Sequence, residues 1–165
     1  MSKFLNRIRL FLKMRTRLKW LFFKATLYSL WVEGFVIFNS SYLLRKAIKN
    51  KKETILQSPQ QKSIVRDVSL VMRVIGRRAP WDPMCLNLSY VAKNILRSYQ
   101  IESTFRLGYL PREPETKLEG HAWITIDGKL VTGRLPNLKE YVEMTYPKQK
   151  DLSDLQFDVT PNKNP

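Results

Sequence analysis

PWDPMCLNL, residues 80–88, contains the single cysteine of the 165-residue chain, Cys85. Apolar residues follow it at steps of three and four, the spacing of one helix face: Leu88, Val91, Ala92, Ile95, Leu96 and Tyr99. Pro83 is favourable just before or at the beginning of a helix. We therefore expect Cys85 in the first helical turn, where unpaired backbone N–H groups carry partial positive charge and favour the thiolate.

A second motif, GHAWI at residues 120–124, contains the single histidine, His121. It continues as a β-rich run to Ile126, and Asp127-Gly128 separates this run from another at residues 129–133. Asp-Gly between two such runs predicts a β-hairpin. A cysteine at a helix start and a histidine on a strand are the pieces of a nucleophile and its general base, which need only meet in space. Our candidate catalytic residues are Cys85 and His121.

Together these motifs resemble the transglutaminase-like cysteine peptidases of lasso-peptide biosynthesis. The resemblance rests on Cys85-Leu86 with its apolar helix, Phe105 to Tyr109, His121 to Ile124 and the Asp-Gly hairpin. It runs from about Asp67 to Gly133, and more loosely over the basic N-terminal region. It implies a leader peptidase that cuts a ribosomally made lasso precursor peptide before ring closure. It also implies a separate leader-binding recognition protein, and a lasso cyclase as a pathway partner.

The fold class that we expect is α+β with a papain/transglutaminase-like core. In this core the helix carrying Cys85 packs on an antiparallel sheet carrying His121. We divide the chain into a basic N-terminal helical region, residues 1–57, and a transglutaminase-like cysteine peptidase domain, residues 64–165. The expected elements are a linker at Ser58–Ser63, a helix at Asp67–Arg78, a strand at Ser103–Tyr109, a loop at Leu110–Glu119, a short helix within Pro136–Tyr146 and a frayed tail at 161–165.

The N-terminal region predicts a buried helix face with basic residues around it. Leu21, Ala25, Tyr28 and Val32 continue a helical stripe, and we expect it to pack on the domain. Gly34 is expected to interrupt the helix, with Asn39-Ser40-Ser41 capping a further one. Lys24 and Glu33 break the apolar run too early for a membrane span. The basic residues of this helix are either simply solvated or make reversible contact with a membrane surface.

The charge balance is strongly basic, with 29 Lys and Arg against 14 Asp and Glu and a formal net charge of +15. This favours an acidic partner, although no nucleic-acid-binding motif occurs and we expect no nucleic acid. We expect no cofactor, since one Cys and one His make a poor zinc site. A lone thiol suits the reducing cytoplasm. Two other functions stay open: a transglutaminase-like acyl transferase, and a non-catalytic basic adaptor or membrane-surface protein in which Cys85 only packs.

The resemblance also implies a third catalytic residue that orients the histidine, and here this sequence departs from the family. Relatives often place an acid about twelve residues beyond the histidine, and here that position is Gly133. A two-residue turn would pair Trp123 with Thr132 and put Thr132 on the face of His121, one diagonal step away. Asp127, at the far end of the strand, would lie roughly 20 Å from His121. We therefore assign Thr132 as the residue that orients His121.

Overall fold

The computed structural model describes residues 13–48, 54–111 and 119–144, without the side chains of residues 35–41 and 43. The expected frayed tail at 161–165 lies outside the described residues. The order of elements is α2 (Thr16–Ile48), α3 (Pro59–Arg78), α4 (Cys85–Ser98), β1 (Thr104–Leu110), β2 (Glu119–Ile126), β3 (Lys129–Thr132), the 3₁₀ helix η1 (Leu138–Glu140) and β4 (Val142–Glu143).

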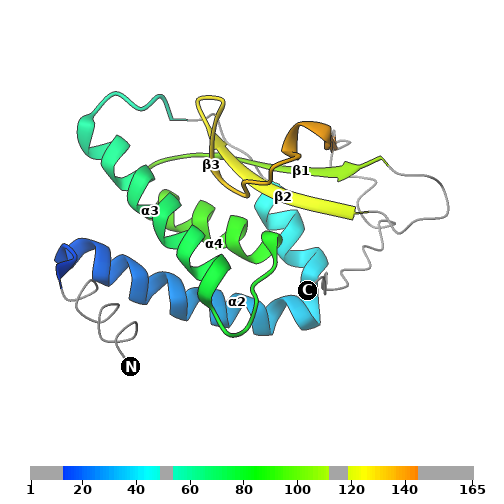
Figure 1. Ribbon diagram of the computed structural model, residues 1–165, viewed down its shortest axis with the longest axis horizontal. Helices are drawn as coiled ribbons and strands as arrows, with labels where there is room; N and C mark the ends of the chain where they lie inside the picture. Colours follow the sequence, from blue (N-terminus) through cyan, green and yellow to red (C-terminus); the bar gives the residue numbers. More distant parts are fainter. Residues whose placement is uncertain (1–12, 49–53, 112–118, 145–165) are drawn as a thin grey trace.

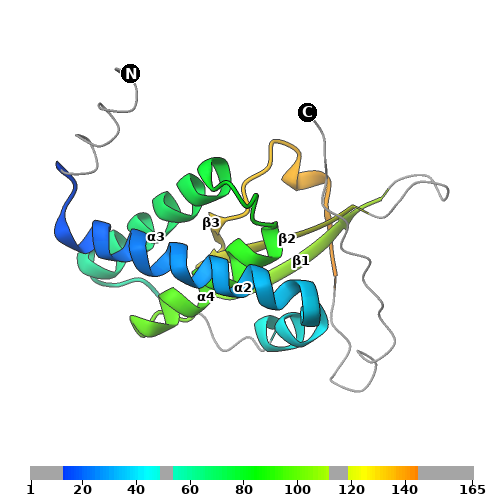
Figure 2. The same cartoon turned by 90° about the horizontal axis from the view of Figure 1, so that it is seen from below.

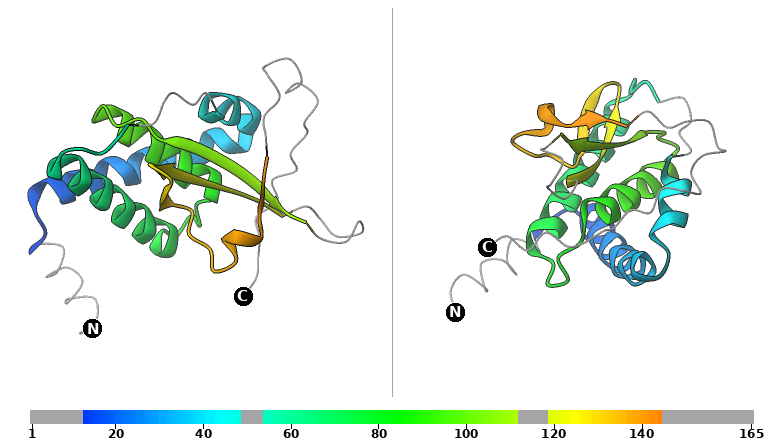
Figure 3. Two further views of the ribbon diagram at one scale, coloured as in Figure 1. Left: turned by 90° about the horizontal axis from the view of Figure 1, so that it is seen from above. Right: turned by 90° about the vertical axis from the view of Figure 1, so that its right-hand side faces the viewer.

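The strands form an antiparallel sheet in the order β3-β2-β1-β4, and the helices cover one of its faces (Figures 1 and 3). A smaller apolar cluster is formed by Leu110 of β1, Trp123 of β2 and three residues from the segment after β3, namely Leu135, Leu138 and Tyr141. The predicted α+β class, with a Cys85 helix on an antiparallel His121 sheet, is confirmed. The predicted short helix at 136–146 is reduced to the three residues of η1.

Helix α4 is the centre of the main core. Val91, Ala92, Ile95 and Leu96 are buried, as their spacing predicts, while Leu88 and Tyr99 of the same predicted face are partly buried. The helix is enclosed by α2, α3 and the sheet, so even polar positions such as Asn87 and Ser89 lie out of contact with water. A helix enclosed in this way is held firmly, because moving it would expose apolar surface on several sides.

Helix α2 packs on this core through the predicted residues. Leu21, Ala25 and Val32 are buried, and Tyr28 packs on Tyr90 with ring centroids 6.3 Å apart. Figure 2 shows α2 crossing in front of α4. The predicted interruption at Gly34 and the cap at residues 39–41 are wrong, since α2 is one helix to Ile48. A single helical glycine costs only about 1 kcal/mol relative to alanine, and a long helix tolerates that. None of the described helices combines the length and the apolar character needed to cross a membrane.

Helix α3 begins where a linker was expected. Ser58 is its N-cap: the Ser58 hydroxyl accepts from the Gln61 N–H at 3.1 Å, and the Gln61 side chain accepts from the Ser58 N–H at 3.3 Å. Pro59 fits the first helical position because its missing N–H would have had no partner there. The polar run is therefore a capping box, and the linker prediction for residues 59–63 is wrong.

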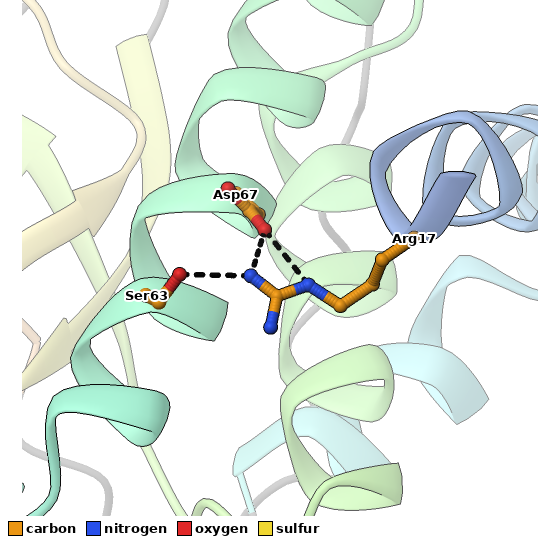
Figure 4. A network of polar contacts seen from close by, with 3 residues as sticks. All are labelled: Arg17, Ser63 and Asp67. Atoms are coloured by element: carbon orange, nitrogen blue, oxygen red, sulfur yellow. Dashed lines mark hydrogen bonds and ion pairs between the residues drawn. The ribbon is translucent and has the colours of Figure 1, made fainter. Parts of the chain in front are cut away.

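Arg17 at the beginning of α2 fastens this helix to α3. Its guanidinium donates to the Ser63 hydroxyl at 2.8 Å and through two nitrogens to one carboxylate oxygen of Asp67 (Figure 4). Arg17 thus belongs to an interhelical contact and not to a solvated basic face.

The β2–β3 hairpin has the predicted turn and a different register. Asp127 and Gly128 have φ values of 51° and 66°, as a type I′ turn requires. Ile126 pairs with Lys129 and Thr125 with Leu130, as predicted. Beyond them a bulge adds one residue to β3, so Thr132 pairs with Ile124 and not with Trp123. The predicted register is wrong there because an extra residue shifts the following side chain to the other face of the sheet.

Candidate active site

Cys85 is the first residue of α4, as predicted. Met84 precedes it as N-cap with extended backbone, and the Leu88 N–H donates to the Met84 carbonyl at 3.1 Å. The N–H groups of Cys85, Leu86 and Asn87 therefore have no acceptor within the helix. Those of Cys85 and Leu86 point to the thiol and act to lower its pKa. Cys85 as a whole residue is partly exposed.

The Cys85 thiol lies against the sheet at Ala122, the residue after His121. The backbone of Ala122 lies close enough to the Cys85 thiol to lower its pKa, and the Ala122 carbonyl accepts from the Ser89 hydroxyl at 3.0 Å. Cys85 and Ser89 are four residues apart and lie on one face of α4. One turn of α4, from Cys85 to Ser89, therefore lies against the backbone of Ala122. The neighbouring strand β3 has already ended at Thr132. This attachment sets the position of Cys85 relative to the histidine strand.

His121 is held by the main chain of the segment that follows β3. Its Nε2 lies 2.9 Å from the carbonyl oxygen of Gly133. A carbonyl only accepts, so we assign the proton of the neutral ring to Nε2, which leaves Nδ1 as a lone-pair acceptor. The ring is 8% exposed and lies between Trp123 and Tyr141, with centroids 6.1 Å and 5.6 Å away. Its orientation is thus fixed by one hydrogen bond and two aromatic contacts.

Burial favours the uncharged forms of both Cys85 and His121. Burial raises the pKa of the Cys85 thiol, and the three backbone contacts only partly oppose this. Burial also lowers the pKa of His121, although the Gly133 carbonyl and the charge of Glu119 act to raise it. The expected resting thiolate is therefore corrected: desolvation outweighs the helix N-terminus. At neutral pH these shifts favour the protonated thiol.

Thr132 is not the partner of His121 among the described residues. Because of the bulge, Thr132 lies on the helix side of the sheet, and its Oγ1 is 3.4 Å from Ser89 Oγ. The group that orients His121 is instead the carbonyl of Gly133, at the position twelve residues on where relatives carry an acid. The sequence pattern points to this position, but a glycine there gives no side-chain signal of an orienting role.

A buried polar network behind Cys85 was not predicted. Asn87 Nδ2 donates to the Ser29 carbonyl at 3.0 Å and to Glu33, and Asn87 Oδ1 accepts from the Ser29 hydroxyl at 3.1 Å. Trp81 Nε1 donates to the same hydroxyl at 3.3 Å. Burial raises the pKa of Glu33, while the Asn87 bond opposes this. The network joins α2 to the first turn of α4 and so supports the position of Cys85.

In the parts of the chain that the structure describes, no three His, Cys, Asp or Glu side chains gather as a metal site would require.

Comparison with known protein families assigns the chain to a superfamily. Residues 36–145, about two thirds of its length, match the transglutaminase-like superfamily. The chain belongs to this superfamily, which is typically one of cysteine-dependent enzymes. The matched region contains Cys85, His121 and Gly133 and extends from within α2 to the end of β4. Searches of curated proteins and of solved structures found no significant match.

Proposed function

We propose that the protein is a cysteine peptidase that removes the leader from a lasso precursor peptide. The observation that carries the chemistry is the Ala122 contact: the Cys85 sulfur lies at the residue after His121, and the His121 ring is oriented through Nε2. Membership of the transglutaminase-like superfamily supports cysteine-dependent chemistry. The lasso substrate rests on the resemblance of the Cys85 and His121 motifs to the leader peptidases.

The proposed reaction begins with an uncharged thiol and imidazole. As the Cys85 sulfur attacks the scissile carbonyl, its proton passes to Nδ1 of His121. The imidazolium is stabilised by its Nε2–H bond to Gly133, although less than by a carboxylate. Nδ1 then gives the proton to the leaving amine, and the C–N bond breaks to leave a thioester. Water, deprotonated by Nδ1, hydrolyses the thioester to a carboxylic acid and the free thiol.

The tetrahedral intermediate needs donors for its oxyanion. The Cys85 N–H at the start of α4 is the donor that we propose, because it has no acceptor within the helix and carries the positive end of the helix dipole. Substrate would then displace the resting contact between this N–H and the sulfur.

The partners that we propose are a separate leader-binding recognition protein and a lasso cyclase that uses the cleaved peptide. With a sole, free thiol, the reducing cytoplasm is the compartment in which we propose that the enzyme works.

The test is cleavage of a lasso precursor in the presence of its leader-binding protein, followed by mass spectrometry. We expect two fragments that together have gained one water, and no cleavage by Cys85→Ala or Cys85→Ser. Ser103→Ala, a buried change away from the motif residues, is the matched folded control. Cleavage by Cys85→Ala at an appreciable rate would show that the mechanism is wrong.

Acyl transfer is the second candidate, favoured by the superfamily itself. The same thioester would then be attacked by an amine in place of water. The product would be a new amide or isopeptide without gain of water, which the same mass spectra distinguish from hydrolysis.

A further inference from the structure

The outer surface of α2 carries an exposed apolar stripe. We define the α2 stripe as Trp20, Phe23, Leu27, Leu30 and Trp31, whose exposed fractions are 64%, 56%, 51%, 44% and 59%. Steps of three and four place them on one helix face, opposite to the buried Leu21, Ala25 and Val32. At 1.5 Å per residue the stripe is about 17 Å long. A contiguous apolar surface of this kind marks an interaction site, whereas scattered single residues do not.

The charged residues along the stripe and just before it are basic. Between residues 13 and 32 the sequence has five basic residues and no acidic one. Arg17 is engaged with Asp67, and Lys24 is exposed but donates to Ser98 of α4 at 3.3 Å. Lys13 and Arg15 are exposed in the segment just before α2. Glu33, the one acidic residue of α2, faces the buried Asn87. The surface therefore offers aromatic and aliphatic side chains with positive charges around them.

We propose that the α2 stripe binds the surface of an anionic lipid membrane, with α2 lying along the interface. Trp is enriched at the boundary of headgroups and acyl chains, and a helix with an apolar face and basic flanks binds there through both burial and charge. A second copy of the chain is a poorer occupant, since each copy carries a formal net charge of +15 and like charges repel. The anionic bilayer is the partner that complements both the charge and the aromatic face.

The fold makes this contact compatible with a working site. Helix α2 lies on the side of α4 away from the sheet, so the membrane would contact one side of the molecule and the sheet would face away from it (Figure 1). Binding does not depend on the chemistry of Cys85, and the full-length Cys85→Ala protein should bind membranes like the wild type. Failure of the proposed peptidase activity would therefore leave this proposal standing, and the reverse also holds.

The experiment is flotation of the full-length protein with vesicles of phosphatidylcholine, with or without phosphatidylglycerol, at low and high salt. We expect binding to the anionic vesicles, weakened by salt, and a blue shift of Trp fluorescence. Phe23→Ser with Trp31→Ser should weaken binding at least about tenfold, because both rings lose their buried area in the interface. Each of Lys13→Gln and Arg15→Gln should weaken it about fivefold, since a basic residue near an anionic surface contributes about 1 kcal/mol.

Leu70→Ser on α3 is the matched control, because Leu70 is also an exposed apolar helix residue, at 40%, and lies outside the stripe. It should bind like the wild type. Three results would overturn the proposal: no binding to anionic vesicles, binding that the stripe variants leave unchanged, or concentration-dependent self-association in sedimentation that the stripe variants abolish. The last would identify a second copy as the occupant.

Discussion

The Ser89 hydroxyl donates to the Ala122 carbonyl at 3.0 Å, one helical turn beyond Cys85, whose thiol lies near the Ala122 backbone. This contact ties the nucleophile helix to the histidine strand at the point where the sheet ladder ends. We predict that Ser89→Ala costs about 1–3 kcal/mol of unfolding free energy, because the buried carbonyl loses its partner. A shift of the helix should also lower kcat roughly tenfold or more.

Ser103 supplies the control for that measurement. Its hydroxyl is 1% exposed and is the one buried side-chain polar atom without a hydrogen-bond partner among the described residues. Ser103→Ala should be neutral or stabilising in denaturant unfolding and should keep full activity. Equal losses in both variants would mean that the Ser89 bond has no special role.

Gly133 should tolerate alanine poorly. Its φ is 80°, and a Cβ there would lie 2.5 Å from Trp123 Cβ and 2.7 Å from the Ala122 oxygen. Gly133→Ala must move the carbonyl that holds His121, so we expect kcat to fall at least roughly tenfold. Gly128→Ala is the matched control: its φ is 66° with open space around it. It should lose stability and keep activity. An active Gly133→Ala enzyme would contradict the role of this carbonyl.

The reactivity of Cys85 should rise late with pH. Because its thiol pKa is raised by burial, the alkylation rate with iodoacetamide should increase through a pKa above the usual value of about 8.5. His121→Ala should slow alkylation near neutral pH, since the imidazole that receives the proton is gone. A rate that is already maximal at pH 6 would indicate a thiolate–imidazolium pair instead.

Protonation of His121 should destabilise the fold. A lowered folded-state pKa means that the unfolded chain binds the proton more readily. The stabilising contribution is therefore present above about pH 6.5, the unfolded value, and is lost as pH falls through the folded value. In denaturant titrations at pH 7 and pH 5, His121→Gln should lose less stability than the wild type, because its amide donates to Gly133 at both pH values. Identical losses would count against a buried neutral ring.

Asn87 should couple α2 to the catalytic helix. Asn87→Ala leaves Glu33 and the Ser29 groups without their buried partner, and we expect a loss of about 2–3 kcal/mol in unfolding free energy. Activity should fall as well, since Asn87 is in the first turn with Cys85. Asn94→Ala is the control on the same helix, because Asn94 bonds only locally to the Tyr90 carbonyl. Equal effects would reduce Asn87 to an ordinary helix residue.

The sequence predicted those features that depend on local pattern. The apolar periodicity after Cys85 predicted α4, and Asp127-Gly128 predicted the turn, since both signals are confined to neighbouring residues. The bulge beside Thr132 could not be predicted, because an extra residue in a ladder is decided by packing against another strand. The thiol pKa was misjudged for a related reason: burial depends on α2, α3 and the sheet together, which no local pattern reports.

The orienting group of His121 is an oxygen that every amino acid possesses. The position of this oxygen is set by the backbone conformation, namely by the extra residue before Thr132 and the positive φ of Gly133. Other residue types could adopt the same backbone conformation and place the carbonyl correctly. The same residue types in another conformation would not form the site. A comparison that aligns residue types in search of an acid passes over it, whereas one that aligns backbone directions at the end of β3 finds it.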